Sequence, residues 1–164
     1  MLLCLLFAIS NGKQNSLSFL ESKSHSADKW AITLLAYLQK KDTTKLWQLG
    51  ISSRLFKELY PLLPEGKKAS LDQTEFAWTF FRQDNEKMLL RILEYYGATR
   101  FQFINWKFSD TLILSNQDTL FKNCTLNVKD TLGKEHSIFW IKSIYRSKSG
   151  YKVWSWNADK PIRH

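Results

Sequence analysis

Residues 88–108 read MLLRILEYYGATRFQFINWKF, and the spacing of apolar side chains changes within this stretch. Up to Tyr96 the apolar residues recur every three or four positions, which predicts a helix with one buried side. Gly97 suits the end of that helix, because glycine is common just past helix C-termini. From residue 99 to residue 108 apolar and polar side chains alternate, which predicts a β-strand. The chain therefore changes from helical to strand-forming near residue 98.

Helical patterns extend from this point back to Ala27. Ser70 followed by Gln73 is a capping-box pattern, and it predicts where the last helix begins. We expect that helix to be interrupted near Asp84 or Asn85. Two shorter helical patterns come earlier, and small polar residues at their starts suit helix N-caps. The expected caps are Asp42 to Thr44 for one helix and Ser52 or Ser53 for the next.

Strand patterns continue to residue 156 and are separated by turn-forming residues at 116–118, 130–133 and 147–150. A run of helices followed by a run of strands indicates the α+β class. We predict a single domain over residues 27–157. In it, N-terminal helices are expected to pack on a curved antiparallel sheet of four to five strands.

The first 26 residues differ in composition from the rest. Leu2 to Ile9 is an unbroken apolar run that is too short to span a bilayer. Ala8 and Ser10 are small residues at the spacing that signal peptidase recognises. We interpret residues 1–10 as a signal peptide, with a buried N-terminal strand or helix turn as the alternative, 11–26 as a flexible tether and 158–164 as a tail. The mature protein is then exported, either periplasmic or secreted, and has no transmembrane segment.

Composition excludes several classes of protein. Aromatic residues make up 15% of the chain and include seven tryptophans, which excludes a disordered chain, and two cysteines are too few for a disulfide scaffold. The net charge is +9, with a balance of +3 over residues 11–98 and +6 over residues 99–164. A basic, aromatic sheet suits single-stranded nucleic acid. The basic residues are dispersed, however, and a signal for export disfavours a nucleic-acid partner.

Motifs for catalysis and metal binding are missing from the sequence. The glycines are too scattered for a phosphate-binding loop, and no Gly-x-Ser-x-Gly elbow occurs. The three histidines lie far apart, so no local zinc motif exists, and we expect neither metal nor cofactor. His136 alone lies near the middle of the sheet half, at a strand start, where a histidine is more often a surface or edge residue than a catalytic one. We therefore name no catalytic residue.

Both faces of the predicted sheet carry apolar side chains. One face is expected to hold Cys124, Leu126, Val128, Phe139, Ile141, Tyr145, Trp154 and Trp156. The other is expected to hold Ile138, Trp140, Ile144 and Val153. One face packs on the helices, and the second needs a ligand, a partner chain or tolerated exposure. The candidate pocket residues are Trp106, Trp140, Trp154, Trp156 and His136, and the plainer alternative is an aromatic core with a few exposed rings.

The order of helix, short helix, helix, long helix and antiparallel meander resembles the cystatin-like cone of the nuclear transport factor 2-like superfamily. The segment Ala27–Leu59 is similar to the opening of that family, with residues 41–47 (KDTTKLW) leading to Leu55 and Phe56 on the next helix. The resemblance implies a conical pocket between helices and a bent sheet, and frequent dimerisation through the sheet. The functions it implies range from isomerase or dehydratase to binding, and it assigns no residue of this chain to catalysis.

These features favour a non-enzymatic protein. We expect an exported binding or assembly domain with an aromatic-lined pocket or a sheet-face interface. Its partner would be a small apolar ligand or a protein, and two copies would form a homodimer through the sheet. The alternative is a small-molecule isomerase or dehydratase of the same fold. A carboxylate or histidine buried inside the pocket would favour the enzyme.

Overall fold

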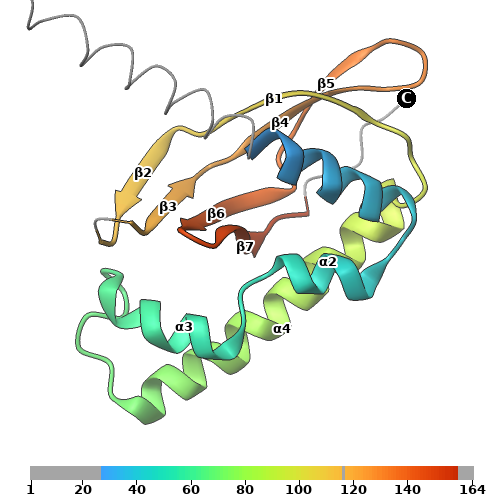
Figure 1. Ribbon diagram of the computed structural model, residues 1–164. Coiled ribbons are helices and arrows are strands. Elements are labelled where there is room, and N and C mark those ends of the chain that lie inside the picture. The colour runs from blue at the N-terminus through green and yellow to red at the C-terminus, as the bar shows by residue number, and fades with distance from the viewer. Residues whose placement is uncertain (1–26, 116, 159–164) are drawn as a thin grey trace, which may run out of the picture.

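The computed structural model describes residues 27–115 and 117–158, which form an α+β fold, as predicted (Figure 1). The helices are residues 27–39, α2 (Thr43–Leu49), α3 (Ser53–Leu59), the 3-10 helix η1 (Tyr60–Leu62) and α4 (Leu71–Tyr96). The strands are β1 (Gln102–Lys107), β2 (Asp110–Ile113), β3 (Thr119–Lys122), β4 (Thr125–Lys129), β5 (Glu135–Ile138), β6 (Ile141–Ser147) and β7 (Gly150–Trp156). The expected signal peptide, the tether and residues 159–164 of the tail lie outside the described residues. None of the helices within the described ranges is long and apolar enough to cross a membrane.

The helix caps follow the sequence pattern closely. Asp42 and Ser52 cap α2 and α3 by accepting hydrogen bonds from backbone N–H groups three residues on, and Ser70 and Gln73 form a full capping box at α4. Gly97 caps the end of α4, as expected. The interruption expected near Asp84 or Asn85 is absent, since α4 is continuous from Leu71 to Tyr96. Asn85 is accommodated because its side chain finds a hydrogen-bond partner at Phe81 O of the same helix.

The strands form two antiparallel sheets, with the orders β1-β4-β5 and β2-β3-β6-β7. These are halves of one bent meander. β3 and β4 are separated only by Asn123 and Cys124, and Asn123 has a φ of 51°, the left-handed region that asparagine tolerates. On the neighbouring strand, Phe139 and Trp140 separate β5 from β6. The expected four to five long strands are therefore divided into seven shorter ones by bends.

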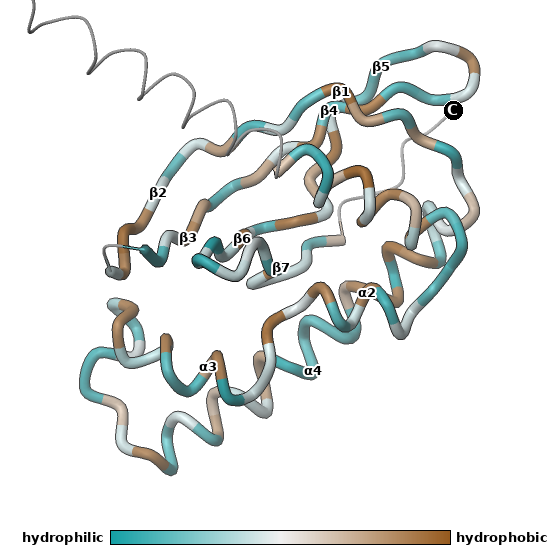
Figure 2. Tube along the Cα trace, in the orientation of Figure 1, coloured by the Kyte–Doolittle hydropathy of each residue, from teal (hydrophilic) through white to brown (hydrophobic). Residues whose placement is uncertain are grey.

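Helices cover both faces of the sheet at β3, β6 and β7, whereas the edge strand β2 is largely exposed. Phe121, Ile144 and Val153 belong to a large core cluster with Leu34 and Leu38 of the first helix. Leu120, Tyr145 and Trp154 alternate with them and form a second cluster with Phe56, Leu59 and Leu63 from α3 and the segment after it. Figure 2 shows apolar and polar positions interleaved along the helices and strands, as expected where each element has one buried side.

The expected division of side chains between faces is partly wrong. Ile144 and Val153 share one face and Tyr145 and Trp154 belong to the opposite cluster, as predicted. Leu126 and Ile138, however, are cross-strand partners and therefore lie on the same face of their sheet, not on opposite ones. The bend between β5 and β6 shifts the register by one residue, and a shift of one residue exchanges the two faces.

Candidate functional site

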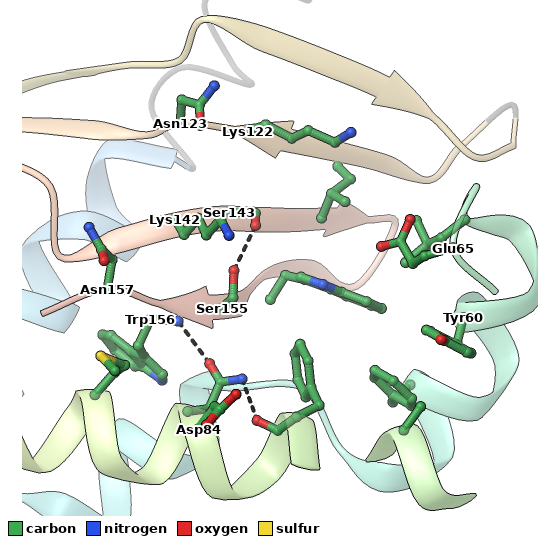
Figure 3. A pocket seen from close by; sticks show the side chains of 18 residues that line it. Tyr60, Glu65, Asp84, Lys122, Asn123, Lys142, Ser143, Ser155, Trp156 and Asn157 are labelled. Atoms are coloured by element: carbon green, nitrogen blue, oxygen red, sulfur yellow. Dashed lines mark hydrogen bonds between the residues drawn. The ribbon is translucent and has the colours of Figure 1, made fainter. Parts of the chain in front are cut away.

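A cavity of about 690 Å³ lies between the helical segment α3–η1–α4 and the face of β3, β6 and β7 that it covers (Figure 3). Helices and strands alike contribute to its wall. The lining residues are Phe56, Tyr60, Leu63, Glu65, Ala77, Phe81, Asp84, Asn85, Met88, Leu120, Lys122, Asn123, Lys142, Ser143, Trp154, Ser155, Trp156 and Asn157.

Two β-bulges help to shape the sheet side of this cavity. Ile141 pairs with Trp156 and Ser143 with Ser155, so Lys142 is an extra residue on β6. One step further, Ile144 pairs with Val153, and Trp154 is the extra residue on β7. A bulge re-aims the side chain of its extra residue, and such bulges recur beside binding sites. Lys142 and Trp154 both line the cavity.

Aromatic rings form the apolar wall. Phe56 lies at their centre and is 1% exposed. Its ring centroid is 4.9 Å from that of Tyr60, 4.8 Å from that of Phe81 and 5.6 Å from that of Trp154. The rings hold one another in place, so this wall is preformed.

Polar side chains interrupt the apolar lining at two places. The Ser143 and Ser155 hydroxyl oxygens lie 2.7 Å apart on neighbouring strands. Asn85 is buried, and its Oδ1 accepts a hydrogen bond from Trp156 N at 2.8 Å while its Nδ2 donates to Phe81 O. Asn85 thus joins α4 to β7 beside the cavity.

Four charged side chains lie on the lining. Lys122 and Lys142 come from neighbouring strands, and Glu65 and Asp84 come from the helical side. Lys122 Nζ is 3.9 Å from Asp110 Oδ2, whereas Lys142 has no ionic or hydrogen-bonding partner among the described residues. Glu65 and Asp84 are both exposed.

Of the five residues predicted for a pocket, two line this cavity: Trp154 and Trp156. Trp140 is fully buried in the larger core, where its ring packs against Tyr96 and Phe101 at centroid distances of 4.7 and 5.5 Å. Trp106 is half-buried, and its ring contacts those of Phe108, Phe121 and Tyr151. These two rings are not part of the cavity lining.

His136 also lies away from the cavity. It is buried at the start of β5, rather than at the surface, and its Nε2 is 2.7 Å from Asp130 Oδ2. Asp130 Oδ1 accepts from the backbone N–H groups of Leu132 and Lys134, so the carboxylate closes the turn between β4 and β5. The hydrogen bond with His136 is the main cause that lowers the pKa of Asp130. This pair stabilises a turn.

Nucleophilic and metal chemistry find little support in the described residues. Burial raises the pKa of the Cys124 thiol to about 12, so the reactive thiolate is scarce at neutral pH. Within residues 27–115 and 117–158 no three histidine, cysteine or carboxylate side chains gather at one place where they could hold a metal ion.

Comparison with known proteins gives no match: no family model, no curated protein and no solved structure matches this chain. The cavity therefore has to be interpreted from its own residues. Sequence reasoning missed the contributions of Phe56, Phe81, Lys122 and Lys142. Phe56 was expected on a short helix, but no local signal placed it or Phe81 opposite β7.

Tyr145 lies on the same sheet face as the cavity wall and bonds to a carboxylate. Its hydroxyl donates to Asp118 Oδ1 at 2.6 Å, and Ser115 donates to Asp118 Oδ2 at 2.7 Å. The bond from Tyr145 is the main cause that lowers the pKa of Asp118, and burial is the main cause that raises the pKa of Tyr145. Asp118 thus contributes stability that is present above its unfolded pKa, about 4, and lost as pH falls through its folded pKa.

Tyr145→Phe is expected to lower the free energy of unfolding by about 1 kcal/mol at neutral pH, because one hydrogen bond to a charged group is lost. The difference from the wild type should shrink as pH falls from about 4 through the lowered pKa of folded Asp118, because protonation of Asp118 removes the charge from this hydrogen bond. Urea unfolding at neutral and acid pH measures this. Tyr95→Phe is the control, since no hydrogen bond to the Tyr95 hydroxyl is found among the described residues. If the difference in the free energy of unfolding stays constant with pH, the stabilising hydrogen bond from Tyr145 to ionised Asp118 is contradicted.

Proposed function

We propose that this protein is a non-catalytic binding domain that holds a small, largely apolar ligand between α3–η1–α4 and β3–β6–β7. The observation that carries the proposal is the cavity of about 690 Å³ with its wall of interlocked aromatic rings. Small-molecule sites typically have volumes of about 300–1,000 Å³ and mostly apolar walls with a few polar groups. The bulges at Lys142 and Trp154 support the same interpretation, since they bring two side chains to the site.

The carboxylates on the lining support binding rather than catalysis. An isomerase or dehydratase needs an acid or base that is held in a shielded position with a pKa matched to its task. Glu65 and Asp84 are exposed, and His136 bonds to Asp130 in a turn away from the cavity. Export of the protein, its pairing through the sheet and its resemblance to the nuclear transport factor 2-like superfamily stay predictions from the sequence.

Titration with 1-aminoanthracene, an uncharged apolar dye, tests the proposal. We expect the wild type to bind one dye per chain with a rise in dye fluorescence. Met88→Trp places a large ring on the cavity wall and should weaken binding by at least about tenfold, which is about 1.4 kcal/mol. Leu90→Trp puts the same ring on the outer side of α4, where Leu90 is 54% exposed, and should bind as the wild type does.

Circular dichroism and thermal unfolding of both variants show whether each is folded. The proposal is contradicted if the wild type binds no dye, or if folded Met88→Trp protein binds as tightly as Leu90→Trp protein. Equal loss of binding in both folded variants would place the dye outside the cavity and would also contradict it.

A further inference from the structure

We propose that the ligand of this cavity is an apolar carboxylic acid, whose carboxylate is held by Lys122 and Lys142 and whose apolar body lies against the aromatic wall. This inference rests on the proposed function, since it names the class of ligand for the same cavity. It starts from the uneven distribution of charge on the lining: both cations lie on the sheet and both anions on the helical side.

The two lysines are brought together by the register of the sheet. Lys122 on β3 pairs with Ser143 on β6, and Lys142 is the residue just before Ser143. The bulge at Lys142 adds its side chain to the face that already carries Lys122 and Ser143. Figure 3 shows both lysine side chains on this face of the sheet. Two cationic side chains that start from neighbouring positions make this part of the wall positive, and a positive wall favours a bound carboxylate.

The lysines are also poorly paired within the protein. Asp110 lies 3.9 Å from Lys122 at an exposed position, which is a weak contact, and Lys142 has no partner in the described part of the chain. Lys142 is exposed and the Lys122 side chain is 38% exposed, so neither lysine is a fully buried residue that needs a partner in the fold. The pair is therefore available to a ligand.

Hydrogen-bond donors near the lysines suit a carboxylate. Ser143 and Ser155 share one hydrogen bond, and a pair of hydroxyls joined in this way keeps one proton that can be donated elsewhere. A carboxylate accepts several hydrogen bonds and donates none when ionised. Unlike the two lysines, the two carboxylates of the lining do not lie on neighbouring positions, because Glu65 follows η1 and Asp84 lies on α4. Figure 3 shows these two on different elements, so they form no joint site for a cation.

Three probes with the same apolar chain test the inference: dodecanoate, dodecanol and dodecylamine, each titrated by calorimetry into the full-length protein. We expect dodecanoate to bind about tenfold more tightly than dodecanol, a ratio typical of one charge-assisted interaction. Dodecylamine should bind no more tightly than dodecanol. The preference for dodecanoate should shrink between about 0.05 M and about 0.5 M salt, because the lysines are solvent-accessible.

Lysine variants test whether Lys122 and Lys142 cause the preference for dodecanoate over dodecanol. Lys142→Met and Lys122→Met keep an apolar stem, so each should weaken dodecanoate binding and leave dodecanol binding unchanged, and the double variant should bind both probes equally. Lys148→Met removes the same charge from an exposed position outside the cavity and should leave the preference intact. Retention of the full preference in the double variant would overturn the inference.

Other outcomes separate this inference from the proposed function. Dodecanol or dodecylamine binding as tightly as dodecanoate overturns the acid preference and leaves the apolar cavity as a binding site. If 1-aminoanthracene binds and no dodecyl probe does, the acid preference is likewise overturned and the apolar cavity remains a binding site. Failure of the dye and of all three dodecyl probes contradicts both proposals.

Discussion

Trp140→Ala is expected to lower the free energy of unfolding by about 4 kcal/mol, because it removes a large, fully buried side chain and leaves a cavity in the main core. Trp140 has 0% exposure, and its ring packs against those of Tyr96 and Phe101. Small domains have total stabilities of about 5–15 kcal/mol, so this change removes a large fraction. Urea unfolding followed by circular dichroism measures the loss.

Trp140→Phe provides the matched comparison. The Trp140 Nε1 atom is buried and has no hydrogen-bond partner in the described part of the chain, so phenylalanine removes an unsatisfied donor while keeping an aromatic ring. We expect this variant to lose less than about 1.5 kcal/mol. If Trp140→Ala and Trp140→Phe lower the free energy of unfolding equally, the expectation that Trp140 stabilises the fold through packing of its ring is contradicted.

Phe56→Ala is also expected to lower the free energy of unfolding by about 4 kcal/mol, because it removes a buried ring from the second core cluster. Phe56 joins α3 to α4 and β7 through its contacts with Phe81 and Trp154. Its loss should loosen the aromatic wall and weaken binding of 1-aminoanthracene in the protein that remains folded. Thermal unfolding and dye titration of the same sample measure the two effects.

Phe76→Ala is the control for this change. Phe76 lies on α4 and is 66% exposed, so its removal should change stability by no more than about 0.5 kcal/mol and leave dye binding intact. Equal destabilisation by Phe56→Ala and Phe76→Ala would contradict the central place that the structure gives to Phe56.

Local chemistry made the helices and the fold class predictable from the sequence. Ser70 and Gln73 form the capping box that the pattern indicated, and Gly97 ends the helix where the apolar spacing changes. These features depend on residues within one or two turns of each other. The change from helices to strands near residue 98 likewise needs no tertiary information, which is why the α+β class could be predicted.

The cavity was less predictable, because it depends on register and on contacts between distant segments. Trp154 and Trp156 were expected at a pocket and do line one. Trp140 was expected there as well, but it lies at the bend between β5 and β6 and is fully buried in the core. The compensating bulges at Lys142 and Trp154 decide which side chains reach the cavity. The residue types at these positions do not predict a bulge. A shift of one position in the register moves a side chain to the opposite face of the sheet.

The indole N–H signals of the protein test the central claim most directly. The chain has seven tryptophans, and single Trp→Phe variants assign their signals in a nitrogen–proton correlation spectrum. If the ligand binds between α3–η1–α4 and the sheet, 1-aminoanthracene should shift the signals of Trp154 and Trp156 and leave that of Trp106 in place. Shifts of Trp106 with unchanged signals from Trp154 and Trp156 would contradict the account.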